Sequence, residues 1–227
     1  MTTVLITGAN RGIGLEFVRH YAGEGAKVHA CCRTPEEARD LKAVSGDVTV
    51  HALDTTNQGQ LDAVANSIEE PVDIVIANAG VYGRSRSEQS FEALSADELN
   101  YTLNVNVTGS LKTLQAFLPH VRKGEGKKMV AITSKMGSIE DASGGAVAYR
   151  ASKTALNMVM SAGAFELKGE GIAVGTLHPG WVRTDMGGPN GNISPEESAK
   201  GLAKVIDGLQ PADKAAFLDY AGKEIPW

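Results

Sequence analysis

Short runs of apolar residues, rich in Val, Ile and Ala, recur along the chain at intervals that suit a strand followed by a helix. They lie at residues 4–7, 27–32, 48–52, 72–77, 128–133, 172–177 and 215–218. Between most of these runs the apolar residues stand three or four apart, as do Ile13, Phe17 and Tyr21, which indicates helices. Nearly continuous apolar strands joined by helices are typical of a parallel sheet that is covered on both faces. The pattern therefore predicts an α/β fold with a doubly wound parallel sheet of about seven strands.

The sequence indicates no boundary between domains, because the chain contains no repeat, low-complexity tract or Pro/Gly/Ser-rich linker. We therefore expect residues 1–227 to form one domain. A helix predicted from about residue 96 to 120 begins at a capping box, in which Ser95 and Glu98 can bond each other's backbone amides. Loops are expected at residues 80–95, 135–147 and 179–194, each after a strand. Ligands of open α/β sheets bind beyond the carboxyl ends of the strands, so these loops predict the position of the site.

Composition limits the class of partner. The chain is 42 % apolar and 22 % charged, with a formal net charge of −5, as in soluble globular proteins. The absence of any basic cluster longer than Lys127-Lys128 argues against nucleic acid. No apolar run reaches the length of a membrane span, and the first residues lack a signal-peptide pattern, so we expect a cytoplasmic protein without membrane contact. The adjacent Cys31 and Cys32 would point to opposite strand faces and are expected to stay reduced.

Three glycines stand where the first strand meets the first helix. Residues 7–14 read T-G-A-N-R-G-I-G. Here Gly8 permits a tight turn, Gly12 lets the backbone approach a pyrophosphate, and Gly14 lets the helix pack against the strand. The free amides of the helix N-terminus would attract the phosphates. Glycine triplets also occur in ordinary flexible turns, but this position in the fold favours a dinucleotide site.

The end of the second strand indicates which dinucleotide binds. Sites for NAD usually carry Asp or Glu there, to hold the ribose hydroxyls, whereas this strand ends in Cys31-Cys32-Arg33. Arg33 and Arg11 could both face a 2′-phosphate, each charge-assisted hydrogen bond contributing roughly 1.5–3 kcal/mol. The alternative is that either arginine is a solvated surface residue. We expect NADP(H) rather than NAD(H).

Tyr149 and Lys153 are four residues apart, and the apolar spacing after them indicates a helix, which would place both on one face. A free tyrosine has a pKa of about 10, and lowering it to near 7 takes about 4 kcal/mol of preferential stabilisation of the phenolate, which a nearby cation can help supply. Such a phenol can give or take a proton. Taken alone, the spacing is more often that of an ordinary surface pair.

In combination these stretches resemble the short-chain dehydrogenase/reductase family. The motifs that carry the resemblance follow in the family's order and spacing: residues 7–14, Asn78-Ala79-Gly80, Asn106, Ser134, Tyr149 with Lys153, and Pro179-Gly180. The resemblance extends from about residue 3 to the last strand. Residues 178–188 and 222–227 make the chain most similar to the C-factor and Sniffer-like carbonyl reductases of that family.

The resemblance implies a Rossmann fold and an NADP(H)-dependent transfer of hydride between the nicotinamide and a carbonyl or secondary alcohol. It implies four catalytic residues. Tyr149 would be the general acid, and Lys153 would lower its pKa and hold the nicotinamide ribose. Ser134 would donate to the substrate oxygen, and Asn106 would order a proton relay. In isolation, Ser134 could instead satisfy a strand-end carbonyl and Asn106 a helical bend.

The resemblance also implies the cofactor contacts. Asp54 would bind the adenine amino group, although an aspartate that forms a turn is an equally ordinary explanation. The full set of expected contacts is Gly8, Asn10, Arg11, Gly12, Ile13, Gly14, Arg33, Asp54, Asn78, Ala79, Gly80, Tyr149, Lys153, Pro179, Gly180, Val182 and Thr184. No spacing of His, Cys and Asp indicates a metal site, and His178 is expected to be a packed residue rather than a base.

A second hypothesis is a dinucleotide-binding signalling or interaction protein, like C-factor, with little or no turnover. The proton-transfer residues favour an enzyme that acts on a small carbonyl or alcohol. The family further implies a homodimer or homotetramer joined through the helices at residues 95–120 and 149–168. The loop at residues 179–195 is short and includes Gly187, Gly188 and Gly191, which predicts a lid that orders when the cofactor binds.

Overall fold

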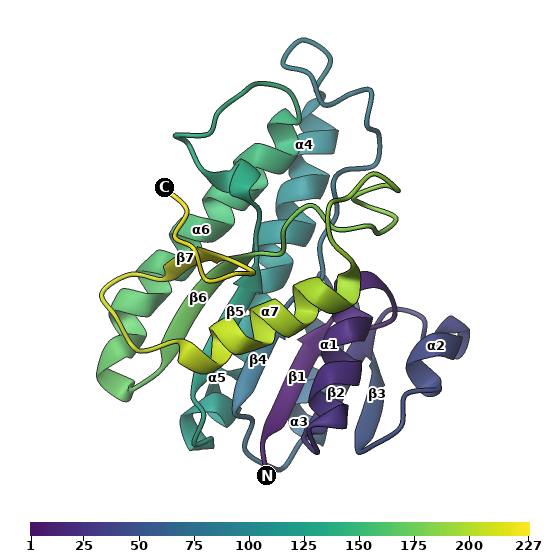
Figure 1. Ribbon diagram of the computed structural model, residues 1–227, viewed down its shortest axis with the longest axis vertical. Helices are drawn as coiled ribbons and strands as arrows, with labels where there is room; N and C mark the ends of the chain where they lie inside the picture. Colours follow the sequence, from purple (N-terminus) through teal and green to yellow (C-terminus); the bar gives the residue numbers. More distant parts are fainter.

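All seven strands run parallel in one sheet, which confirms the predicted fold class. The computed structural model describes residues 1–227, and the strand order is β3-β2-β1-β4-β5-β6-β7 (Figure 1). The strands are β1 (Thr3–Thr7), β2 (Lys27–Cys32), β3 (Val48–Ala52), β4 (Ile74–Ala77), β5 (Lys128–Ile132), β6 (Ala173–His178) and β7 (Ala216–Asp219). The chain order reverses between β1 and β4, and the carboxyl ends beside such a reversal form the usual ligand crevice.

Helices cover both faces of this sheet, because the strands are apolar on both sides. The helices are α1 (Gly12–Gly23), α2 (Arg39–Lys42), α3 (Gln58–Ser67), α4 (Ala96–Leu103), α5 (Ser110–Lys123), α6 (Val147–Leu167) and α7 (Pro195–Gly208). Val4 and Ile6 of β1 pack with α1 and α7, whereas Leu5 between them packs with α3, α5 and α6 on the other face. Figure 1 shows α1 and α7 crossing the near face. The alternation of neighbouring residues along each strand thus builds two separate cores.

Each predicted strand is present, with ends that differ by one or two residues at most. The largest difference is at β4, which begins at Ile74 rather than residue 72. The backbone amide of Val72 donates to the carbonyl of His120 at 3.3 Å instead of joining the ladder. Cys31 and Cys32 are buried free cysteines in opposite cores, which agrees with the predicted reduced pair.

The helix predicted at residues 96–120 contains a break in its hydrogen-bond pattern. The capping box is partly confirmed, because Ser95 Oγ accepts from the Glu98 amide at 3.2 Å. Residues Asn104–Gly109 then form a π-helical segment between α4 and α5. The backbone hydrogen bonds of such segments have less favourable geometry than those of an α-helix, and the segments occur mostly at functional sites. Here the segment contains Asn106.

The three predicted loops follow β4, β5 and β6 and gather at one edge of the sheet, above α6 and α7 in Figure 1. The second loop includes a 3₁₀ turn at Lys135–Gly137. None of the helices combines the length and the apolar character that crossing a bilayer requires.

Candidate active site

The glycine loop between β1 and α1 has the shape expected of a phosphate cradle. Gly8 has a φ of +66°, which favours glycine, and a side chain at Gly14 would lie 2.2 Å from the Gly8 carbonyl oxygen. No side chain caps the first turn of α1, since Arg11 makes no capping hydrogen bond. The amides of that turn are therefore available to an anion. The loop fits a dinucleotide pyrophosphate.

The end of β4 holds this loop in place. Asn78 Nδ2 donates to the carbonyl oxygens of Thr7 and Gly8, at 2.9 and 3.2 Å. In return, Thr7 Oγ1 accepts from the amides of Asn78 and Ala79, both at 3.1 Å. Asn78 and Ala79 thus lie beside the cradle as expected, and the Asn78 side chain acts by fixing the loop.

The two arginines expected at a 2′-phosphate have different surroundings. Arg11 Nη1 donates to Asp185 Oδ2 at 2.6 Å, and both side chains are exposed. Arg33 is exposed at the end of β2, and its charge helps to keep the pKa of Asp54 low. Arg33 is thus free to meet a phosphate in this arrangement, whereas Arg11 would first have to leave Asp185.

Asp54 forms a turn at the end of β3. Its Oδ1 accepts from the Thr56 amide at 2.9 Å and from the Thr56 hydroxyl at 2.7 Å. Burial would raise the pKa of Asp54, but these hydrogen bonds and Arg33 outweigh it and hold the pKa below its usual value. The turn alternative therefore describes this residue, and contact with an adenine stays a prediction.

Tyr149 stands in the first turn of α6, and its buried side chain lies next to Ser134. The residue is 8 % exposed. Burial raises the pKa of Tyr149 to about 12, the nearby phenol of Tyr82 adds to the rise, and a hydrogen bond with Ser134 opposes it. The sequence predicted a value lowered toward neutrality. The difference arises because removal from water destabilises the phenolate more than its neighbours stabilise it.

Lys153 lies one helical turn beyond Tyr149 and is also buried. Its Nζ is 5.7 Å from the centroid of the Tyr149 ring and donates to the Ile132 carbonyl oxygen at 2.8 Å. Burial lowers the pKa of Lys153 to about 8. The ammonium therefore faces the tyrosine ring, as the four-residue spacing predicted, while its hydrogen bond goes to the end of β5.

Asn106 is completely buried in the π-helical segment. Its Oδ1 accepts from the Val81 amide at 2.8 Å, and its Nδ2 donates to the Val81 carbonyl oxygen and to Ser152 Oγ, both at 2.9 Å. A side chain at Gly80 would lie 3.2 Å from Asn106 Oδ1 and 3.5 Å from Lys153 Nζ. The structure thus brings Asn106, Gly80 and Lys153 together at the end of β4.

The loop at residues 179–194 packs against the start of α7 and lies next to the glycine loop. Gly180 has a φ of +84°, and the Pro179 carbonyl oxygen accepts from Ser198 Oγ at 2.6 Å. Val182 is buried and pairs with Ile193. Thr184 approaches the glycine loop so closely that a side chain at Gly12 would lie 3.4 Å from its methyl carbon. Asn10 and Ile13 flank that position and are half-buried.

Tyr82 and Arg86 were missed by the sequence prediction. The Tyr82 ring stacks on the Tyr149 ring, with centroids 4.9 Å apart. The Arg86 guanidinium lies 5.0 Å from the centre of the Tyr82 ring, and its Nη2 donates to the Met186 carbonyl oxygen across the cleft. Tyr82 follows Asn78-Ala79-Gly80 in a loop that the sequence predicts at the site. An aromatic residue in such a loop could have indicated a site residue.

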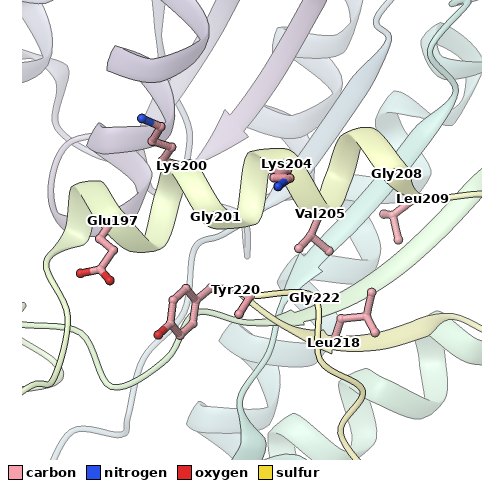
Figure 2. Close-up of a pocket in the computed structure, with 11 residues that line it drawn as sticks. Glu197, Lys200, Gly201, Lys204, Val205, Gly208, Leu209, Leu218, Tyr220 and Gly222 are labelled. Atoms are coloured by element: carbon pink, nitrogen blue, oxygen red, sulfur yellow. The ribbon is translucent and has the colours of Figure 1, made fainter.

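Two hollows lie near this edge of the sheet. The larger, of about 600 Å³, lies between α7 and the turn after β7 (Figure 2). Its lining includes Val205, Leu218 and Tyr220 but none of the predicted site residues. The smaller, of about 380 Å³, is lined by Lys135, Glu140 and Asp141 and by residues near the C-terminus, and by none of the predicted catalytic residues. His178 lines it, and burial lowers the pKa of this histidine to about 4, so it is a neutral packed residue, as expected.

Comparisons with known proteins agree with this geometry. The short chain dehydrogenase family model matches residues 2–192. The C-signal of Myxococcus xanthus is 41 % identical over 158 residues, which cover 69 % of this chain and 93 % of that protein. The NADPH-bound carbonyl reductase from chicken fatty liver has a TM-score of 0.90 and 32 % identity, covering 100 % of this chain and 99 % of its own. The carbonyl reductase Sniffer of D. melanogaster has a TM-score of 0.91 and 28 % identity, with full coverage of both chains.

Proposed function

The chain belongs to the short-chain dehydrogenase family of oxidoreductases, and from this premise we propose that it transfers a hydride between NADP(H) and a carbonyl or secondary alcohol. The observation that carries the proposal is the meeting of Tyr149, Ser134 and Lys153 at the carboxyl end of β5. A buried phenol, a hydroxyl and an ammonium at one place can position and protonate a carbonyl oxygen. NADP(H) dependence is supported by the exposed Arg33 and by the NADPH bound in the chicken carbonyl reductase.

The cofactor would lie across the carboxyl ends of β1 and β4. The glycine loop would hold the pyrophosphate, Arg33 and Arg11 would hold the 2′-phosphate, and Gly80 would leave room for the ribose next to Lys153. The other predicted contacts, in the 179–194 loop, would face the nicotinamide. NADPH supplies the hydride when it is bound.

Tyr149 would deliver the proton. Its pKa of about 12 keeps the hydroxyl protonated at neutral pH, which suits the reduction of a carbonyl. Ser134 Oγ accepts from the Met136 amide at 3.1 Å, and its O–H, which is hydrogen-bonded with Tyr149 in this structure, would donate to the substrate oxygen once a carbonyl binds between the two side chains. The Lys153 charge near the ring would stabilise the phenolate that remains. Asn106 would keep the end of β4 and the start of α6 aligned through Val81 and Ser152.

Replacement of the phenol tests this function. We expect Tyr149→Phe to lower kcat/KM by about 100- to 10,000-fold, the usual contribution of a general acid. NADPH consumption across a panel of aldehydes and ketones gives the activity, and the control is NADPH binding, which should change far less than kcat/KM because Tyr149 is only one of many expected cofactor contacts. Full activity in this variant would remove the tyrosine mechanism.

A second candidate is a dinucleotide-binding signalling or interaction protein with little or no turnover. Its support is the similarity to the C-signal over two thirds of the chain. Tight binding of NADPH by the unaltered protein, together with no consumption of NADPH on any carbonyl of the panel, would favour this candidate.

We also propose that the chain forms a homodimer or homotetramer through α4, α5 and α6. Met158 and Phe165 are 69 % and 59 % exposed, and their spacing of two helical turns places them on one face of α6. Large apolar side chains that are aligned and exposed on a helix are typical of association surfaces.

A further inference from the structure

We propose that Arg150 is a positioning residue that holds residues 139–145 as a wall of the substrate site. The inference rests on the proposed function, because it concerns the place where the carbonyl compound would bind. Arg150 directly follows Tyr149 in the first turn of α6. Neighbouring residues on a helix point about 100° apart. While the phenol of Tyr149 lies in the cleft, the Arg150 side chain therefore reaches into the loop that precedes α6.

The guanidinium group bonds this loop at four points. Nη1 donates to the carbonyl oxygens of Asp141 and Met136, at 2.9 and 3.4 Å. Nη2 donates to Ser143 Oγ at 2.7 Å, and Nε donates to the Gly145 carbonyl oxygen at 3.2 Å. All three nitrogen atoms of one planar group are thus used on a single stretch of chain. A lysine could make only part of this set, because its donors sit on one atom.

The two halves of this loop differ in how they are held, and only the second half depends on the Arg150 guanidinium for anchoring. The first half is packed on α6. A side chain at Gly137 would lie 2.9 Å from the Lys153 backbone, and the Gly137 carbonyl oxygen accepts from Thr154 Oγ1 at 3.0 Å. In the second half, residues 142–145 are exposed. Gly144 and Gly145 both have a positive φ and carry no side chain that could anchor them.

This loop also borders the hollow of about 380 Å³, because Lys135, the residue after Ser134, lies on its lining together with Glu140 and Asp141. A substrate whose carbonyl oxygen is bonded by Ser134, and which is longer than a simple aldehyde, would extend along this wall. None of the hydrogen bonds of Arg150 goes to the Tyr149 hydroxyl or to Ser134. Its loss should therefore weaken the binding of bulky carbonyls and leave the proton transfer largely intact.

The test compares Arg150→Gln and Arg150→Lys with Arg122→Gln, an exposed arginine of α5 that bonds Glu170 instead. In Arg150→Gln we expect KM for a bulky aromatic ketone to rise about tenfold, as after loss of a charge-assisted hydrogen bond, with kcat changed less. KM for propanal and the Kd for NADPH should stay unchanged. The KM of Arg150→Lys for the bulky ketone should lie between those of Arg150→Gln and the unaltered protein. The KM of Arg122→Gln should equal that of the unaltered protein.

Hydrogen exchange provides a readout that needs no activity. The amides of residues 139–145 should exchange faster in Arg150→Gln, and not in Arg122→Gln. Unchanged exchange would overturn the proposal, and so would a KM that rises equally for propanal and the bulky ketone. Arg150→Lys keeps the test decisive if Arg150→Gln does not fold. An unaltered protein that reduces no carbonyl would instead refute the proposed function, and the role of the wall in substrate binding with it.

Discussion

The protonation states of two buried residues, Tyr149 and Lys153, determine how the reaction should respond to pH. Lys153 has a pKa of about 8, and its ammonium form is the one that supports proton transfer. We expect kcat/KM for carbonyl reduction to be level near pH 6–7 and to fall as the pH rises through about 8, because the ammonium then loses its proton. Measurements of kcat/KM from about pH 6 to 10 would show this decrease as the falling limb of the pH profile.

Lys153→Arg supplies the comparison. Arginine keeps its charge over this range, so the falling limb should move to higher pH even if the overall rate drops. An identical limb in both proteins would assign the titration to another group.

Arg33 should decide between the two nicotinamide cofactors. Its side chain is exposed at the end of β2 and makes no salt bridge. The guanidinium group is therefore available to bind a 2′-phosphate. We expect Arg33→Glu to raise the Kd for NADPH by about 10- to 100-fold, as loss of a hydrogen bond to a charged group implies, with little effect on NADH. Fluorescence titration of both cofactors measures this. Equal loss of both affinities would point to a folding defect rather than to phosphate recognition.

Residue types near the site could be predicted from local spacing, but several of their partners could not. The glycine positions follow from steric limits that act over a few residues, and Gly8 and Gly14 are placed as predicted. The pairing of Arg11 with Asp185 joins residues 174 apart and depends on how one loop folds over another. The pKa of Tyr149 likewise depends on burial in the finished fold, which a four-residue spacing does not describe.

Helices and strands were easier to predict than their irregularities. The strands β2 and β3 have the predicted ends, because each is a short run rich in Val and Ala with a charged residue at one boundary, Arg33 after β2 and Asp47 before β3. The π-helical segment at Asn104–Gly109 leaves no such mark, since its apolar spacing still resembles a continuous helix. It is stabilised by tertiary contacts, among them the two hydrogen bonds between Asn106 and Val81.

The neighbouring strands β2 and β3 carry a histidine pair that should make the fold sensitive to acid. His29 Nδ1 lies 3.0 Å from His51 Nε2, and His29 Nε2 lies 3.2 Å from Glu70 Oε1. Burial lowers the pKa of His51 to about 4, from 6.5, and the pKa of His29 is lowered too. The unfolded chain therefore binds protons first, and stability that is present above about pH 6.5 is lost as the pH falls toward 4.

For His51 this loss amounts to at most about 3 kcal/mol, at 1.36 kcal/mol per pKa unit. We expect urea unfolding to show a smaller drop in stability from about pH 7 to 5 in His51→Gln than in the unaltered protein. His20→Gln, at the end of α1, is the matched control. An equal drop in all three proteins would show that other groups cause the acid sensitivity.

The proposed association through α6 would cover the face of this helix that carries Met158 and Phe165. A charge at Met158 or Phe165 would be buried without a partner in an oligomer but solvated in a monomer. We expect Met158→Glu and Phe165→Glu to lower the molar mass measured by light scattering to that of a single chain. Ala212→Glu, in an exposed stretch before β7, should leave the mass unchanged. A single-chain mass for the unaltered protein would contradict the proposal.

The two polar contacts that span the cleft, from Arg11 to Asp185 and from Arg86 to the Met186 carbonyl oxygen, lie in water at the surface. The exposed ion pair between Arg11 and Asp185 should contribute less than about 1 kcal/mol, and dissolved ions screen it further. Entry of a dinucleotide would thus meet little resistance from this side. The salt concentration of the medium should therefore affect how readily Arg11 leaves Asp185 to meet a phosphate.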